Sequence, residues 1–262
     1  MTPPARRKRG MTLSQPVRAI LLDLDGTLLD IDFRSFMSDY VTRLAEHFAD
    51  TIDPEVFKGR LFQSTSAMIF NSVPGRTTLQ AFLDDFSEAV PLPDDAMERF
   101  EDFYARVFPR LGHWGRPSPG GRELIEAALE RGLAVVVATA PFFPEPAIRE
   151  RLRWAGVADL PFAFVSSSDK MTRSKPFPEY FLEISERIGV PPEQCLMVGD
   201  EALMDGAAVK AGMQAALVGP EKPSFTGPWL KGTPLEKAEA PDVPRWPDLP
   251  ALHRHLAKEG IL

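Results

Sequence analysis

Short apolar runs alternate with amphipathic stretches over most of this chain. The apolar runs lie at 17–22, 133–138, 162–165, 196–198 and 215–218. Runs of this length are typical of strands that are buried on both faces of a sheet. Apolar residues recur with helical spacing between the later runs, at 122–131, 146–154, 178–188 and 207–211. Strands that alternate with helices predict right-handed crossover units and a mainly parallel sheet, which is an α/β fold.

Residues 31–116 have a different pattern. Apolar and aromatic residues recur there with helical spacing in four successive stretches, at 33–48, 56–70, 79–90 and 97–108. Asp53 and Pro54 suit the N-cap and the first position of the second helix. No strand-like run is evident between 31 and 116. We therefore expect an all-helical subdomain inserted after the first strand, with the aromatic residues forming its core.

The two ends of the chain carry weaker signals. Residues 1–16 contain the basic run 6–9 and no apolar segment that resembles a signal peptide, so we expect a disordered basic tail. Residues 220–248 are rich in Pro, Lys and Glu without a clear period, which predicts a long surface segment. The pattern of residues 249–262 predicts a last helix.

Composition narrows the class of protein. With 262 residues, 44% hydrophobic and 26% charged, the chain is an ordinary globular one with room for a large core. It has no apolar run of about 18 residues, and its net charge is −7, so we expect neither a membrane nor a nucleic-acid partner. The single cysteine, Cys195, lies within an apolar run. We expect a buried structural thiol and a reducing, cytoplasmic location.

The first apolar run ends in two closely spaced carboxylates, Asp23 and Asp25, followed by Gly26 and Thr27. Ligands of parallel sheets bind beyond the carboxyl ends of the strands, so both carboxylates lie where chemistry is expected. Two anions this close repel each other unless a cation or a shared proton offsets the charge. The alternative is a loop that only caps the next helix, because Asp, Gly and Thr favour turns.

Later segments bring further polar groups to the same edge of the predicted sheet. Thr139 follows the second strand, Asp200 follows the fourth, and Asp205 lies five residues beyond Asp200. Lys175 precedes a helix. Clustered carboxylates form a hard oxygen site that suits Mg²⁺ and leaves positions for water and a phosphate. The hydroxyl and the ammonium add donors for phosphate oxygens. Each residue alone could be a turn, cap or solvated residue, but together they favour a site.

This combination resembles the haloacid dehalogenase superfamily of phosphohydrolases over roughly residues 17–219. Its four motifs appear here as Asp23-Leu24-Asp25-Gly26-Thr27, Thr139, Lys175-Pro176, and Gly199-Asp200 with Asp205. The resemblance implies a Rossmann-like, three-layer catalytic core at 17–30 and 117–262, with 31–116 as a mobile helical cap. It further implies a Mg²⁺-dependent phosphomonoester hydrolase that acts on a small phosphorylated metabolite. We expect a monomer or homodimer.

The resemblance also assigns roles to residues. Asp23 would be the nucleophile that forms an aspartyl-phosphate, Asp25 the general acid and base, and Lys175 the group that neutralises charge. The residues that would hold the phosphate are Asp23, Leu24, Asp25, Thr139, Ala140 and Lys175. The residues that would hold Mg²⁺ are Asp23, Asp25 (through its carbonyl) and Asp200, with Asp205 behind them. Many members carry Asn after the second-motif hydroxyl, whereas here Ala140 offers only its backbone N–H and Pro141 has none.

Two alternatives remain open. A phosphotransferase such as a sugar-phosphate mutase would use the same Asp23 and Asp25 and would differ in how the closed cap excludes water. A non-catalytic binding protein could retain the site, and Ala140 is the feature that favours it. Dehalogenation is disfavoured because it needs neither an acid two residues after the nucleophile nor a metal cluster.

Several residues of the cap are candidates for choosing the substrate. The cations that could reach an anionic leaving group are Arg34, Lys58, Arg60 and Arg76. The aromatic residues that could shape the pocket are Phe33 and Phe62. His47 and His113 belong to no motif, so we expect them to be structural.

Overall fold

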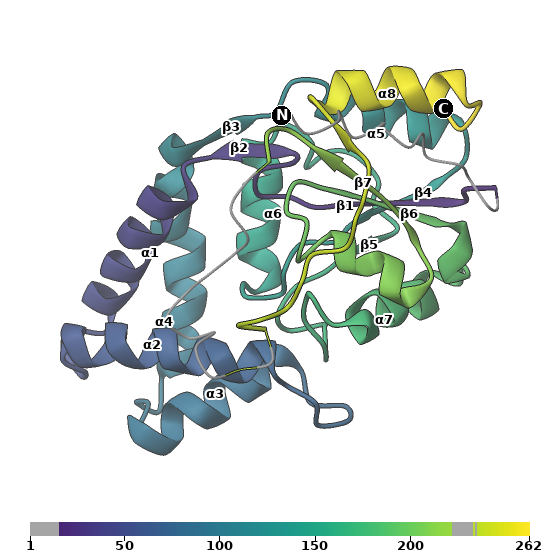
Figure 1. Cartoon of the computed structure of the whole chain (residues 1–262). Coiled ribbons are helices and arrows are strands. Elements are labelled where there is room, and N and C mark those ends of the chain that lie inside the picture. The colour runs from purple at the N-terminus through teal and green to yellow at the C-terminus, as the bar shows by residue number, and fades with distance from the viewer. Residues whose placement is uncertain (1–15, 222–232, 234) are drawn as a thin grey trace, which may run out of the picture.

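The computed structural model of the chain describes residues 16–221, 233 and 235–262. At its centre six strands form one sheet in the order β5-β4-β1-β6-β7-β8, and every pairing between them is parallel (Figure 1). The strands are β1 (Ala19–Leu22), β4 (Ala134–Val137), β5 (Phe164–Val165), β6 (Cys195–Gly199), β7 (Gln214–Val218) and β8 (Arg245–Trp246). The predicted α/β fold is confirmed.

Helices cover both faces of the sheet and produce three layers (Figure 1). Along β1, Ile20 and Leu22 face one hydrophobic core, whereas Ala19 and Leu21 face a second. The helices that pack on the first core are α5 (Gly121–Glu130), α6 (Glu145–Trp154) and α8 (Leu249–Lys258). The elements on the second core are α7 (Pro178–Ile188) and the 3₁₀ helix η4 (Gly206–Ala211). Burial on both faces explains why these strands lack polar alternation.

The four expected helical stretches form a segment at residues 33–114, which we call the helical segment. It contains α1 (Phe33–His47), α2 (Pro54–Ile69), α3 (Thr78–Ala89), α4 (Ala96–Asp102), the π-helix η1 (Phe103–Val107) and the 3₁₀ helix η2 (Phe108–Trp114). Asp53 caps α2 as predicted, since its Oδ1 accepts from the Glu55 and Val56 amides at 3.0 and 3.1 Å. Its fully buried rings belong to the first core, and they are Phe36, Phe48, Phe57, Phe86, Phe103 and Phe108.

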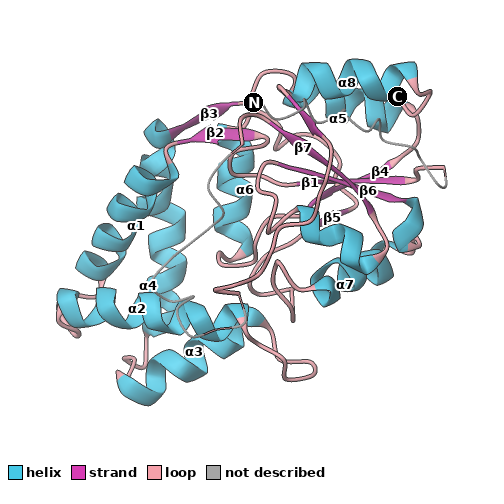
Figure 2. Cartoon of the chain, in the orientation of Figure 1, coloured by secondary structure: helices cyan, strands magenta, loops and turns pink. Residues whose placement is uncertain are grey.

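A two-stranded antiparallel sheet lies where the helical segment joins the rest of the protein (Figure 2). β2 (Leu29–Ile31) pairs with β3 (Gly115–Pro117), so the expectation of no strand between 31 and 116 was wrong. Both strands span three residues and β3 contains Gly and Pro, which are depleted in strands, so neither produced an alternating pattern. The chain therefore leaves the core and returns to it through neighbouring strands.

Other boundaries differ from those expected. The single helix expected at 97–108 changes from α to π to 3₁₀ form, and η4 is 3₁₀ rather than α. The surface segment at 220–248 includes strand β8, and a short 3₁₀ helix, η3 (Pro192–Gln194), precedes β6. The basic tail expected at 1–16 lies outside the described residues except for its last one.

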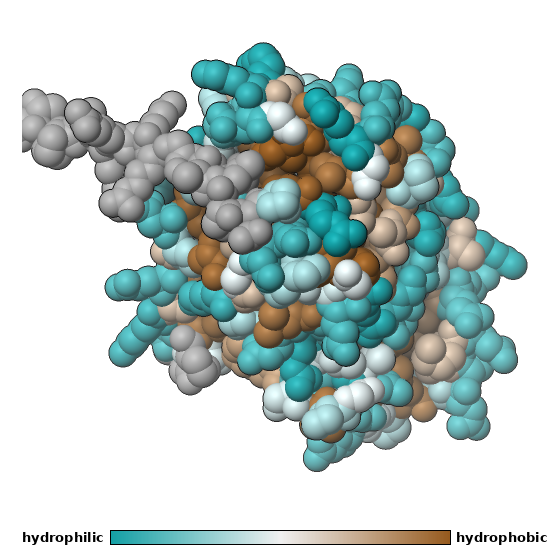
Figure 3. All heavy atoms as spheres, turned by 90° about the vertical axis from the view of Figure 1, so that its right-hand side faces the viewer, coloured by the Kyte–Doolittle hydropathy of each residue, from teal (hydrophilic) through white to brown (hydrophobic). Residues whose placement is uncertain are grey.

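The surface agrees with a globular protein. The face on the right-hand side of Figure 1 is mostly hydrophilic, with smaller hydrophobic areas between the hydrophilic residues (Figure 3). Within the described part of the chain, no helix combines the length and the apolar character needed to cross a membrane.

The packing of α8 on the sheet gives a test of the fold. Leu252 is fully buried on the first core, so Leu252→Ala should lower the free energy of unfolding by about 2–5 kcal/mol. Arg254→Ala, on the exposed side of the same helix, should change it by less than about 0.5 kcal/mol. Urea unfolding measures both. Equal effects would mean that α8 does not pack as described.

Candidate active site

The carboxylates predicted from the first and fourth motifs lie side by side because their strands are neighbours. β1 and β6 pair with Leu22 opposite Val198, so Asp23 and Asp200 emerge at the same edge of the sheet. The backbone N–H of Asp23 donates to the Val198 carbonyl at 2.9 Å, which extends the strand pairing up to the site. Both aspartates are buried, at 8% and 6% exposure.

Lys175 joins this edge from the loop before α7. Its Nζ donates to Asp23 Oδ1 at 2.8 Å and to Asp205 Oδ1 at 2.6 Å. The lysine is 1% exposed, so both contacts form away from solvent. Charge-assisted hydrogen bonds of this kind are stronger than neutral ones. The ammonium of the third motif therefore bridges a residue of the first motif and a residue of the fourth.

Asp205 is held by donors on both of its carboxylate oxygens. While Oδ1 accepts from Lys175, Oδ2 accepts from the backbone amides of Asp200 and Glu201, both at 3.0 Å. This arrangement needs a glycine at the end of β6, because a Cβ on Gly199 would lie 2.1 Å from the Asp205 Cγ. Gly199 thus leaves the space in which the Asp205 carboxylate lies.

The cluster carries more negative than positive charge. Single ligand oxygens of Asp23, Asp200 and Asp205 lie within 4.8 Å of one another, and all three residues are buried. Burial raises the pKa of Asp23 well above its usual range; Lys175 lowers it, but the Asp205 and Asp200 charges raise it again. Burial lowers the pKa of Lys175, yet the charges of Asp205 and Asp23 outweigh that effect and raise it. An all-oxygen, electron-rich cluster of this kind fits a hard divalent metal ion.

Asp25 is held from a different direction. Its Oδ2 accepts a hydrogen bond from the Nη1 of Arg151, which is fully buried on α6. The Arg151 guanidinium lies over the ring of Phe143, with 4.3 Å from Cζ to the ring centroid. Among the described residues, the other oxygen of Asp25, Oδ1, is buried without a hydrogen-bond partner. Asp25 therefore has one fixed oxygen and one that remains available.

Sequence reasoning missed Arg151, although a signal was present. The buried face of α6 consists of Ala147, Ile148, Arg151 and Leu152. Arg151 thus occupies an apolar position of an amphipathic helix, where a charged side chain is costly unless it is paired. An arginine in such a register predicts a buried partner, but the pattern cannot name one that lies 126 residues away.

The predicted site residues meet in one pocket of about 250 Å³. Its lining includes Asp23, Asp25, Thr139, Ala140, Lys175, Asp200 and Asp205. Leu24 is not part of the lining, because its side chain is fully buried and its carbonyl accepts from the amides of Thr27 and Leu29. Phe33, Phe142 and Phe143 add an aromatic side to the pocket.

The basic candidates of the helical segment do not reach this pocket. Arg60 pairs with Asp85 at 2.6 Å, Arg76 with Asp84 at 3.3 Å and Lys58 with Glu55 at 2.9 Å. None of the three, nor Arg34, lines the pocket. An anionic leaving group would therefore find none of the expected cations next to it.

The remaining candidates have structural surroundings. His47 lies 3.7 Å from Asp102, and His113 Nδ1 contacts the Arg110 carbonyl at 2.9 Å, both outside the pocket. Cys195 is buried in β6, and burial raises the pKa of its thiol to about 11. These residues agree with the structural roles expected for them.

Comparison with known proteins agrees with this geometry. The model of the haloacid dehalogenase-like hydrolase family matches residues 17–212. The chain belongs to this family.

Proteins with similar sequences include a phosphatase. A phosphoglycolate phosphatase of Nitrosospira multiformis is 30% identical over 202 residues, which cover 75% of this chain and 80% of that protein. The chloroplastic protein SUPPRESSOR OF QUENCHING 1 of Arabidopsis thaliana is 26% identical over 205 residues, 77% of this chain but 18% of that protein. The crystal structure of CbbY from Rhodobacter sphaeroides in complex with phosphate shares the fold. Its TM-score is 0.55 at 22% identity, over 90% of this chain and 96% of that one.

Gly199 provides a test of how Asp205 is held. Gly199→Ala would force the Asp205 carboxyl to move, so it should lower the free energy of unfolding by about 1–3 kcal/mol. Gly59→Ala is the matched control: it lies in α2 with no atom within 4 Å of its added Cβ. That variant should be about 0.5–1 kcal/mol more stable. Thermal and urea unfolding compare the two, and an unaffected Gly199→Ala would contradict the described position of Asp205.

Proposed function

We propose that this protein is a cytoplasmic, Mg²⁺-dependent phosphomonoesterase that acts on a phosphorylated metabolite through an aspartyl-phosphate. The observation that carries the proposal is the bridge from Lys175 to Asp23 and Asp205 within a buried carboxylate cluster. The membership in the family and the phosphatases among the relatives support it.

Asp23 is the proposed nucleophile. Its carboxylate attacks phosphorus, the bond between phosphorus and the alcohol oxygen breaks, and water then hydrolyses the aspartyl-phosphate. Lys175 donates to Asp23 Oδ1, which leaves the second oxygen to attack and offsets part of the repulsion between two anions. Thr139 and the backbone N–H of Ala140 lie in the same pocket and supply donors for the phosphate oxygens.

The carboxylate cluster is the proposed Mg²⁺ site. Asp23, Asp200 and the backbone carbonyl of Asp25 would hold the ion, which would supply positive charge that offsets the repulsion between the carboxylate and a phosphate. Asp205 acts behind them, since both of its oxygens already accept from Lys175 and from backbone amides. In that position it fixes Lys175 and the loop that carries Asp200.

Asp25 is the proposed general acid and base. Protonated at Oδ1, the oxygen without a partner among the described residues, it gives a proton to the departing alcohol and then takes one from water. Arg151 fixes the other oxygen, Oδ2, and so holds the carboxyl in place at the pocket that Asp25 lines. Because Arg151 acts through Asp25, it is a positioning residue.

Phosphate release from a panel of phosphomonoesters tests the proposal. Turnover should require Mg²⁺, stop with a chelator, and fall by about a thousandfold or more in Asp23→Asn. Asp94→Asn, an exposed carboxylate of the helical segment, is the control and should retain full turnover. Wild-type turnover that survives chelator, together with turnover in Asp23→Asn, would contradict the mechanism. Transfer of phosphate between two hydroxyls of a sugar phosphate would favour the mutase alternative.

A second test separates positioning by Arg151 from a purely structural role. Alkyl phosphates need a proton on the departing oxygen, whereas p-nitrophenyl phosphate leaves without one. Arg151→Met should therefore lower kcat about a hundredfold on an alkyl phosphate and less than about tenfold on p-nitrophenyl phosphate. Arg151→Lys should restore part of the loss, because it keeps the charge. Equal losses on both substrates would assign Arg151 to the fold alone.

A further inference from the structure

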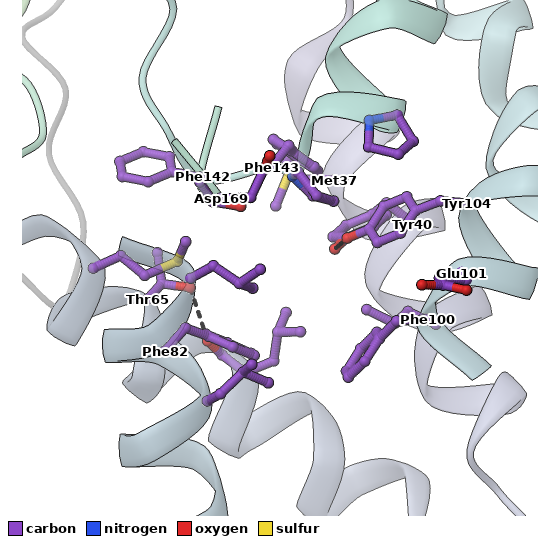
Figure 4. Close-up of a pocket in the computed structure, with 18 of the residues that line it drawn as sticks. Met37, Tyr40, Thr65, Phe82, Phe100, Glu101, Tyr104, Phe142, Phe143 and Asp169 are labelled. Atoms are coloured by element: carbon purple, nitrogen blue, oxygen red, sulfur yellow. Dashed lines mark hydrogen bonds between the residues drawn. The ribbon is translucent and has the colours of Figure 1, made fainter. Parts of the chain in front are cut away.

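A second cavity, of about 400 Å³, lies between the helical segment and the loop after β4 (Figure 4). Side chains from several elements surround it, including Met37 of α1, Met68 of α2, Phe82 and Leu83 of α3, and Phe142 of the loop. Its size falls within the range of pockets that bind small organic molecules. We call it the apolar cavity, because most of its lining side chains are hydrophobic.

The apolar cavity adjoins the catalytic pocket. Phe33, Phe142 and Phe143 line both. Phe142 and Phe143 come from the loop that begins at Thr139, which lies in the catalytic pocket. A group bonded to a phosphate at Asp23 therefore has the apolar cavity beside it.

The polar groups of the apolar cavity do not suit an anion or a sugar. Among the described residues, the charged lining residues are Glu101 and Asp169, and both are acidic. The hydroxyls of Tyr40 and Tyr104 bond to each other at 2.9 Å, and that of Thr65 donates to the Leu61 carbonyl at 2.8 Å. The Ser168 hydroxyl has no partner among the described residues, but its oxygen is buried. Groups that are already paired gain little from a sugar hydroxyl, and carboxylates repel another anion.

We propose that the apolar cavity holds the leaving group, and that the substrates are phosphomonoesters of apolar alcohols with an aliphatic or aromatic chain. This inference rests on the proposed function. The bond that breaks is again the one between phosphorus and the alcohol oxygen, and the alcohol leaves with the proton from Asp25. The cations of the helical segment agree with it, since Lys58, Arg60 and Arg76 are paired with acidic residues outside the cavity.

A series of primary alkyl phosphates from ethyl to octyl tests the proposal. The reacting bond is nearly the same throughout the series, so differences in kcat/KM report the fit of the chain. Each methylene that enters the cavity should raise kcat/KM about three- to fourfold, and octyl phosphate should exceed ethyl phosphate by about a hundredfold or more. Phosphoglycolate and glucose 6-phosphate should be poorer substrates than octyl phosphate. A flat series, or a preference for either polar substrate, would overturn the proposal.

Two variants that reduce the cavity sharpen the test. Leu83→Phe on α3 and Met37→Phe on α1 should each lower the ratio of octyl to ethyl kcat/KM by about tenfold or more. Val56→Phe, on the exposed side of α2 and outside the lining, should keep the wild-type ratio. The two substitutions lie on different helices, so the test can still be made if one of the variants does not fold. A wild-type ratio in either folded cavity variant would overturn the proposal.

The same measurements separate this inference from the function on which it rests. Asp23-dependent hydrolysis of ethyl phosphate without a rise along the series would overturn the inference and leave the phosphomonoesterase intact. Absence of Asp23-dependent hydrolysis from every phosphomonoester would overturn both. A rise with chain length that is abolished in Asp23→Asn would support both.

Discussion

Mutual repulsion of buried carboxylates at the ends of β1 and β6 is the constraint on which the site depends. Strand pairing fixes Asp23 beside Asp200, and the absence of a side chain at Gly199 lets Asp205 come close to both. Lys175 offsets only part of the charge, since one ammonium faces the oxygens of two carboxylates. The edge of the sheet thus has an excess of negative charge, which makes it suited to bind a divalent cation. A cation bound there would in turn favour a phosphate next to it.

Phe143 connects the chemistry with the choice of substrate. It lines both the catalytic pocket and the apolar cavity, and its ring lies under the guanidinium that holds Asp25. A chain in the apolar cavity would therefore touch the same ring against which Arg151 rests. In the proposed mechanism, binding of the leaving group and alignment of the acid would therefore depend on the same aromatic side chain.

The sequence predicted the parts of the structure that depend on local pattern. Buried apolar runs located β1, β4, β6 and β7, and the shared edge of parallel strands brought Asp23 and Asp200 together as expected. The pairing of Arg151 with Asp25 could not be predicted, because it depends on how α6 packs. The ion pairs of the candidate residues Arg60 and Arg76 could not be predicted for the same reason. Their partners, Asp85 and Asp84, are set by the packing of α2 on α3 and by the loop between them.

The paired strands β2 and β3 bring the two chain connections of the helical segment side by side. Ile31 lies opposite Gly115, and the Asp32 amide bonds to the Trp114 carbonyl at 3.2 Å, so the two ends of the segment meet where it joins the core. The helical segment is therefore a loop whose ends are held together by β2 and β3. The entropic cost of closing a loop grows only slowly with the length of the loop. A change in the length of this segment therefore adds little loop-closure entropy to the cost of forming the sheet, and the strand ends that carry the carboxylates can stay in place.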